Sequence, residues 1–147
     1  MPESPKNSFG SPMPVFRVKD VNASIAYYLE ALGFELRWRA GEAFACVGRD
    51  NCSIFLTNDN QSQPHMCIWI GVQDARALHQ RYITTGAKIR KPPNNFEWAL
   101  EMQVEDLDGN VLRLGCDNKP GEPFGDWLDM RGVRWRRDAE GGWTRAE

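Results

Sequence analysis

The sequence lacks features that several classes of protein need. No segment has the roughly 20 consecutive apolar residues that span a bilayer, and residues 1–12 hold no apolar stretch typical of a signal peptide. The formal net charge is only −2, so no uniform positive field would hold nucleic acid or an acidic membrane surface. We therefore expect a cytoplasmic protein with neither nucleic acid nor membrane as a partner.

Residues that commonly bind metals or form cross-links are scarce and widely spaced. The only histidines are His65 and His79. The four cysteines form no C-x-x-C pair; they are Cys46, Cys52, Cys67 and Cys116. In a reducing compartment we interpret them as small packing residues, and their spacing indicates no zinc site.

The sequence does contain an internal repeat with a period of about 54 residues, the separation of Asp20 from Asp74. Each copy reads as an apolar strand, a polar cap, an amphipathic helix and a glycine stop. The cap is Asp20 or Asn22 in the first copy and Asp74 in the second, and the stops are Gly33 and Gly86. A unit of this length cannot bury its own apolar face. Two copies therefore predict a paired architecture with a cleft.

After each helix the apolar pattern changes to the two-residue period of strands. We expect strands over 34–38, 44–47 and 53–57 in the first copy, and over 88–90, 98–104 and 111–115 in the second. Each copy then reads βαβββ, which gives an α+β fold. We divide the chain into a flexible N-terminus (1–12), a single domain of two modules (13–117, with modules 13–59 and 64–117) and a Trp- and Arg-rich C-terminal extension (118–147).

Three short patterns occur in an order that resembles a known family. They are P-V-x-x-V-x-D over 14–20, L-G-F over 32–34 and E-D-x-D-G-N-x-x-x-L over 105–114. This order resembles the vicinal oxygen chelate superfamily of glyoxalases, bleomycin-resistance proteins and dioxygenases. The resemblance implies paired βαβββ modules whose sheets curl into a cup, with the ligand inside and often a dimer to complete it.

The resemblance also implies where metal-using members carry their ligands. Those positions fall on Met13, Phe55, Cys67 and Arg113. These side chains are unsuited to a divalent ion, and the guanidinium of Arg113 has the wrong sign of charge. We therefore expect no metal and no cofactor. A makeshift site of His65, Cys67 and Glu101 is the weaker alternative.

The alternation of the strands predicts which side chains face the cup. In the first strand Met13, Val15 and Arg17 share one face, while Phe16 and Val18 point to the helix. The same argument gives a set of aromatic, charged and thiol side chains that we predict to bind the ligand: Arg17, Trp38, Phe55, Cys67, Trp69, Trp98, Glu101 and Arg113. Aromatic faces stack on planar groups, and arginines fix carboxylates or other planar polar groups.

Purely structural roles remain open for several of these residues. Phe55 and Trp69 could simply fill the interior of a curled sheet. Arg113 and Glu101 lie on neighbouring predicted strands and could neutralise each other as an ion pair. Cys67 is best interpreted as packing, because no base nearby would activate its thiol.

The C-terminal extension has a pattern of its own. Trp127, Trp135 and Trp143 recur every eight residues with glycines between them, as in a hairpin with an aromatic face. The extension could cover the cup as a lid or dimer arm. We favour a hairpin packed on the outside of the sheet.

The sequence thus predicts a metal-free, homodimeric protein, resembling the bleomycin-resistance branch, that sequesters an aromatic or polar small molecule without catalysis. One alternative is a lyase or dioxygenase that depends on a divalent metal. A second is a structural or regulatory dimer whose cup has filled in.

Overall fold

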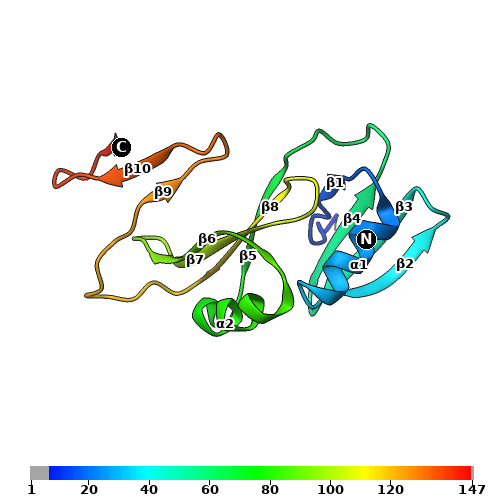
Figure 1. Cartoon of the computed structure of the whole chain (residues 1–147), viewed down its shortest axis with the longest axis horizontal. Coiled ribbons are helices and arrows are strands. Elements are labelled where there is room, and N and C mark those ends of the chain that lie inside the picture. Colours follow the sequence, from blue (N-terminus) through cyan, green and yellow to red (C-terminus); the bar gives the residue numbers. More distant parts are fainter. Residues whose placement is uncertain (1–6, 147) are drawn as a thin grey trace, which may run out of the picture.

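The computed structural model describes residues 7–146 and confirms the two predicted βαβββ modules (Figure 1). The first module contains β1 (Val15–Arg17), α1 (Val21–Glu30), β2 (Glu35–Ala40), β3 (Phe44–Arg49) and β4 (Cys52–Thr57). The second contains β5 (Cys67–Gly71), α2 (Ala75–Thr85), β6 (Lys88–Asn95), β7 (Leu100–Glu105) and β8 (Val111–Cys116). Their sheets have the matching orders β1-β4-β3-β2 and β5-β8-β7-β6, and the first strand of each runs parallel to the last.

Aspartates cap both helices, Asp20 being the one of the two candidates that caps the first. The side chains of Asp20 and Asp74 accept hydrogen bonds from the backbone N–H groups of Ala23 (3.1 Å) and Ala77 (3.0 Å), which satisfies donors that have no partner within the helix. α2 ends at Gly86, whose φ of +82° is the left-handed conformation that favours glycine. α1 ends before Gly33, with Ala31 as its C-cap.

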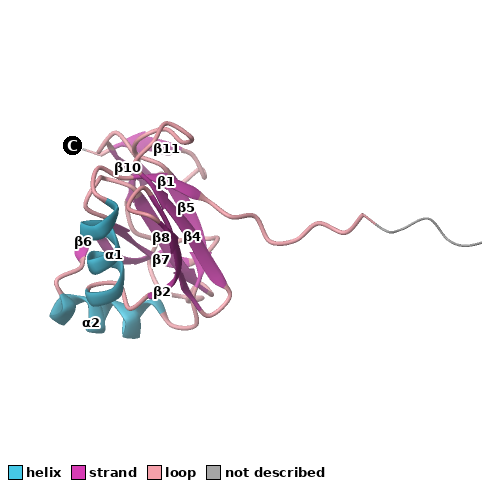
Figure 2. Ribbon diagram, turned by 90° about the vertical axis from the view of Figure 1, so that its right-hand side faces the viewer, coloured by secondary structure: helices cyan, strands magenta, loops and turns pink. Residues whose placement is uncertain are grey.

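The helices lie on one side of the strands and leave the other side open (Figure 2). Phe16, Leu56 and Leu112 point to the helices and are fully buried in the core. We call the opposite side of the two sheets the inner face. Period-two alternation places on it Val15, Arg17, Phe55, Trp69, Gln103 and Arg113. The predicted division of faces in the first strand is confirmed.

A hydrogen-bond network, buried at Tyr28, Asp106 and Asn110, joins the two modules. Tyr28 Oη in α1 donates to Asp106 Oδ2 (3.0 Å), and Asn110 Nδ2 donates both to Asp106 Oδ2 (2.9 Å) and to the Arg17 carbonyl (3.1 Å). The Lys19 backbone N–H donates to Asp108 Oδ1 (3.0 Å). The E-D-x-D-G-N pattern therefore fastens the second module to the first.

The second module departs from prediction at its edge. β6 extends to Asn95 and includes Pro92 and Pro93, whereas the sequence predicted a strand over 88–90 only. Prolines are tolerated because β6 is the edge strand of its sheet, and the register shifts against β7 on either side of Lys91.

The C-terminal extension forms a three-stranded antiparallel sheet, not a two-stranded hairpin. Its strands are β9 (Trp127–Leu128), β10 (Arg134–Arg137) and β11 (Trp143–Arg145). Gln103 Nε2 donates to the Leu128 carbonyl (3.0 Å), and the guanidinium of Arg90 donates to the Asp129 carbonyl. Because Gln103 points to the inner face, the expectation that the extension packs on the outside is wrong: it lies on the inner face of the second sheet.

The remaining expectations about the chain ends concern residues 1–12. Residues 7–12 have no regular secondary structure, and residues 1–6 lie outside the described residues. Within the described part of the chain, no helix has the length and apolar character needed to cross a membrane.

Candidate ligand-binding surface

An ion pair stands at the centre of the second sheet's inner face. Arg113 in β8 donates through Nε to Glu101 Oε2 and through Nη2 to Glu101 Oε1, both at 2.9 Å. Trp98 Nε1 also donates to Glu101 Oε1. The Glu101 side chain is 1% exposed, so its carboxylate is fully engaged and cannot serve as an accessible general base. The structural pairing left open by the sequence is confirmed.

The inner face of the first sheet carries an aromatic cluster. The ring centroids of Trp38, Phe44 and Phe55 lie 5.3–5.6 Å apart. Phe55 is thus held by packing, while Trp38 remains 46% exposed. A bulge in β2 between Leu36 and Trp38 brings Arg37 to the same face, where it donates to Ser53 Oγ (3.0 Å).

Trp69 lies flat on the inner face of the second sheet because β8 offers a glycine beneath it. A Cβ at Gly115 would stand 2.7 Å from Trp69 Cζ2, closer than any side chain could approach. One face of the indole therefore rests on backbone while 50% of the residue stays exposed. An exposed tryptophan that is held flat is a ready stacking platform.

Trp98 stands between the second sheet and the extension. Its ring stacks on Phe96 with centroids 4.7 Å apart and planes 3° from parallel. The rings of Trp127 and Trp143 approach it at 6.0 and 6.1 Å. Trp98 is still 47% exposed. It is therefore a surface side chain that its aromatic neighbours hold in place.

Three hollows follow one another along this surface, separated by Trp69 and Trp98. The Met13 hollow, of about 720 Å³, lies at the junction of the modules between Met13 and Trp69. The central hollow, of about 460 Å³, lies between Trp69 and Trp98 over Gly115. The tryptophan hollow, of about 380 Å³, is lined by Trp98, Arg113, Trp127, Trp135 and Trp143. These volumes suit small-molecule binding.

The predicted ligand-binding residues gather only in part at these hollows. Trp69, Trp98 and Arg113 line them, and Glu101 holds Arg113 in place. Trp38 and Phe55 form the separate cluster on the first sheet. Arg17 lines another hollow with His65 and Asp108, so the predicted convergence of Arg17 with Arg113 in one hollow does not occur.

The family's metal positions do not fit a divalent ion. Phe55 is packed between aromatic rings and Arg113 is bound to Glu101, so neither position offers a donor atom. Partial burial raises the pKa of the Cys67 thiol, and this outweighs the opposite effect of Arg113. Over residues 7–146 no three His, Cys, Asp or Glu side chains group closely enough to hold a metal. The alternative site of His65, Cys67 and Glu101 is therefore not assembled.

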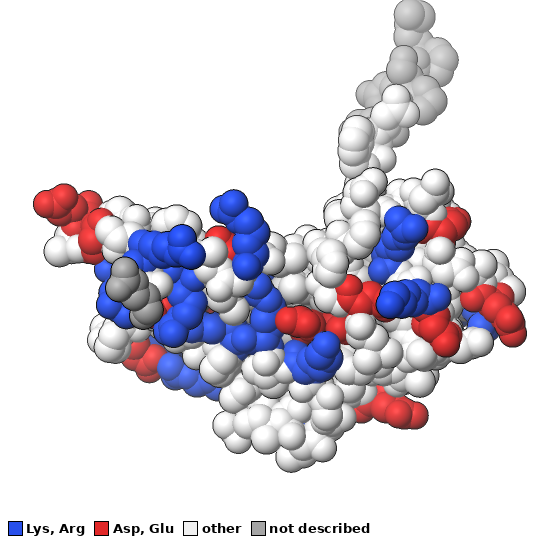
Figure 3. Space-filling model, turned by 45° about the horizontal axis from the view of Figure 1, so that its top comes forward, with Lys and Arg blue, Asp and Glu red and all other residues white. Residues whose placement is uncertain are grey.

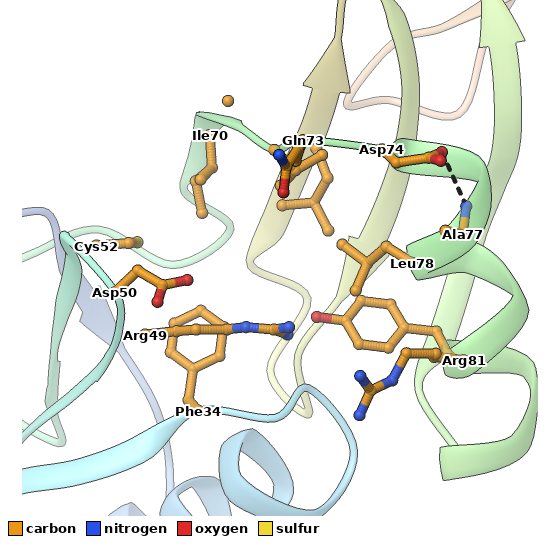
Figure 4. A pocket seen from close by; sticks show the side chains of 14 residues that line it. Phe34, Arg49, Asp50, Cys52, Ile70, Gln73, Asp74, Ala77, Leu78 and Arg81 are labelled. Atoms are coloured by element: carbon orange, nitrogen blue, oxygen red, sulfur yellow. Dashed lines mark hydrogen bonds between the residues drawn. The ribbon is translucent and has the colours of Figure 1, made fainter.

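A further cavity, of about 370 Å³, opens on the helix side between the modules (Figure 4). Arg49 from β3 and Arg81 from α2 reach into it beside Phe34, Ile70 and Leu78. Arg49 Nη1 donates to the Leu32 carbonyl (3.3 Å), a hydrogen bond within the first module. Asp74, at the rim, is engaged as the N-cap of α2.

The sequence did not predict that several further residues contribute to the inner face. Arg90, whose side chain is 11% exposed, anchors the extension from β6. Trp127 and Trp143 complete the tryptophan hollow. The eight-residue spacing of the tryptophans was a visible signal, but it did not show which surface they would cover.

Comparisons with known proteins agree with this architecture. The sequence profile of the Glyoxalase/Bleomycin resistance protein/Dioxygenase superfamily matches residues 11–114. No curated protein matches the chain in sequence.

Solved structures with the same fold include two that bind antibiotics. A bleomycin-binding protein from bleomycin-producing Streptomyces verticillus, complexed with copper(II)-bleomycin, has a TM-score of 0.65 and 22% identity, over 78% of this chain and 100% of that one. The antibiotic-binding protein TnmS3 from Streptomyces sp. CB03234 has a TM-score of 0.68 and 20% identity, over 77% and 99%. A glyoxalase/bleomycin resistance protein/dioxygenase from Nocardioides has a TM-score of 0.60 and 16% identity, over 81% and 92%. At these identities the likeness concerns the fold.

Proposed function

Because the chain belongs to the glyoxalase/bleomycin resistance protein/dioxygenase superfamily, we propose that it binds a planar small molecule on its inner face and releases it unchanged. The observation that carries this proposal is the row of hollows divided by Trp69 and Trp98, two indoles that are each about half exposed. Stacking on such rings is a favourable and rather unselective way to hold a flat ligand.

The chemistry of the surface supports binding over catalysis. Glu101 and Arg113 neutralise each other. The family's metal positions fall on Met13, Phe55, Cys67 and Arg113, which offer two sulfur atoms but none of the oxygen and imidazole donors that a hard divalent ion needs. A metal-free protein with this surface can sequester its ligand. Two structural neighbours bind antibiotics, one of them copper(II)-bleomycin, and an antibiotic with a planar aromatic group is the ligand class we propose.

We also propose that a second copy of the chain covers the open inner face. Trp38 on the first sheet is 46% exposed, and Met13 is 40% exposed at the junction of the modules. Exposed apolar clusters of this kind are typical of association surfaces. Sedimentation at increasing dilution should show a dimer, and a monomer at every concentration would remove this part of the proposal.

The binding proposal can be tested by titrating the tryptophan fluorescence of the purified protein with bleomycin and, separately, with 1-naphthoate. We expect saturable binding of at least one probe, weakened about tenfold in Trp98→Ala, because this ring borders both the central and the tryptophan hollow and a stacking face worth about 1–3 kcal/mol is lost. Mass spectrometry should recover the probe unchanged.

The control variant is Ile83→Ala, which removes an exposed apolar side chain from α2, on the helix side. Its affinity should equal that of the wild type. Binding of neither probe to the wild type, or equal binding to Trp98→Ala, would contradict the proposal.

A further inference from the structure

We propose that the C-terminal extension builds a subsite of its own, the tryptophan hollow, which selects planar aromatic ligands that carry an anionic acceptor such as a carboxylate. This inference rests on the proposed function and names the ligand class more closely. The superfamily match ends at residue 114, so three of the four tryptophans of this hollow lie outside the matched region.

The extension is firmly attached at this place. The Arg90 side chain, 11% exposed, donates to Gln103 Oε1 and to the Asp129 carbonyl, so it joins β6 and β7 to the extension. Gln103 Nε2 adds a hydrogen bond to the Leu128 carbonyl (3.0 Å). Arg137 of β10 forms a salt bridge with Glu97. These contacts hold the extension against the second module, so the side chains that line the hollow keep fixed positions relative to one another.

The walls of the hollow are flat and apolar. Trp127, Trp135 and Trp143 share one face of the extension's sheet, because Trp135 is the cross-strand partner of Trp127, and Trp143 is that of Arg137, two residues further along β10. Trp98 faces them from the second module. With about 380 Å³ between these rings, the hollow can accept an aromatic group of one or two rings.

Hydrogen-bond donors exceed acceptors in this hollow. The Glu101 carboxylate already accepts from Arg113 and Trp98. Trp135 Nε1 donates to Asp129 Oδ2 (3.0 Å), while Oδ1 accepts from two backbone N–H groups. In contrast, Arg113 Nη1 has no acceptor among residues 7–146, and neither has the indole N–H of Trp127 or Trp143. A ligand that brings acceptor atoms would satisfy these donors.

The charges around the hollow favour an anion over a cation. Aromatic cages attract cations through their ring faces, but here two ring faces are already covered by arginines. The Arg113 guanidinium carbon lies 4.6 Å from the Trp127 centroid, and that of Arg137 lies 5.4 Å from the Trp143 centroid. A cationic ligand would have to displace them.

Basic side chains also gather at the end of the molecule that the extension forms (Figure 3). Among them are Arg131, Arg134 and Arg136, whose side chains are 84%, 55% and 64% exposed. Arg134 and Arg136 pair with Asp126, and Arg131 pairs with Asp129. The preference for an anion therefore rests on Arg113 and on the indole donors of the hollow, and not on these exposed side chains.

The test is a two-dimensional nitrogen–proton NMR spectrum of the whole protein, in which each of the six tryptophans gives one indole N–H signal. Single Trp→Phe variants assign the signals. The probes are 1-naphthoate and 1-naphthylmethylammonium, which share the ring system and differ in the sign of their charge.

We expect 1-naphthoate to shift the indole signals of Trp127, Trp143 and Trp98, and to bind about tenfold more tightly than the ammonium probe. Shifts confined to Trp69 and Trp98 would overturn the subsite and leave the proposed function standing. Equal affinity for the two probes would overturn the preference for anions. If no indole signal moved at millimolar probe, the subsite and the proposed function would both fail.

Discussion

Tyr28 and Asp106, which are 78 positions apart in the chain, share a hydrogen bond of 3.0 Å between modules, and both residues are completely buried. Asp106 belongs to the E-D-x-D-G-N pattern that carried the family resemblance. Its carboxylate also accepts from the backbone N–H groups of Asp108 (2.9 Å) and Asn110 (3.0 Å). This pattern therefore serves the junction of the modules and not the ligand.

Tyr28→Phe should lower the free energy of unfolding by about 1–3 kcal/mol, because it removes a buried hydrogen bond and leaves Asp106 without one of its donors. The affinity for 1-naphthoate should stay within about twofold of wild type. Urea denaturation and the fluorescence titration measure the two quantities. Unchanged stability would contradict a role for this hydrogen bond in holding the modules together.

The stability of the protein should depend on pH through Asp106. Burial raises the pKa of this carboxyl, and its hydrogen bonds from Asn110, Asp108 and Tyr28 oppose the rise only in part. With the pKa higher in the folded than in the unfolded state, the contribution of Asp106 is fully present below its unfolded pKa and is lost as pH rises through its folded pKa.

Asp106→Asn removes this titration. We expect the stability advantage of wild type over the variant to be largest near pH 3 and to shrink towards pH 7, in urea denaturation at each pH. An advantage that grew with pH would mean that the hydrogen bonds outweigh burial, contrary to this account.

Gly115→Ala should displace the Trp69 ring, because the added methyl group would stand 2.7 Å from Cζ2. We expect a loss of about 1 kcal/mol of stability, a lower fluorescence anisotropy of Trp69 and weaker ligand binding. Gly71→Ala is the matched control, since its methyl group would meet Trp69 at an ordinary 3.5 Å. If the two variants bound ligand equally well, the flat seating of Trp69 would not matter for binding.

Glu101→Gln should destabilise the protein by about 2 kcal/mol. Breaking a buried pair leaves a charge without its partner, and the partial exposure of Arg113 (27%) softens that cost. The double variant Glu101→Gln/Arg113→Met should lose less than the sum of the two single variants. Additive losses in a thermal or urea denaturation cycle would show that the two side chains act independently.

Much of the fold could be predicted from local signals. Asp20 and Asp74 are capping residues whose effect reaches only three positions along the chain, and the alternation of Val15, Phe16 and Arg17 places each side chain on its face. The Glu101–Arg113 ion pair could be predicted as an alternative to ligand binding, because the two residues lie on adjacent predicted strands.

The position of the extension could not be predicted in the same way. It depends on Arg90 and Gln103, whose partners in the extension lie 25 to 39 positions away, and no local pattern encodes such contacts. The two prolines in β6 also hid the true length of that strand. Because these long-range contacts are not encoded locally, the expectation that the extension packs outside was wrong, and the tryptophan hollow was not predicted.

Ligand binding on the inner face is tested most directly by a crystal structure of the protein soaked with 4-bromo-1-naphthoate, in which anomalous scattering locates the bromine. We expect a bromine peak on the inner face beside Trp98, in the central or the tryptophan hollow. A peak in the helix-side cavity between Arg49 and Arg81, or no peak on the inner face, would contradict it.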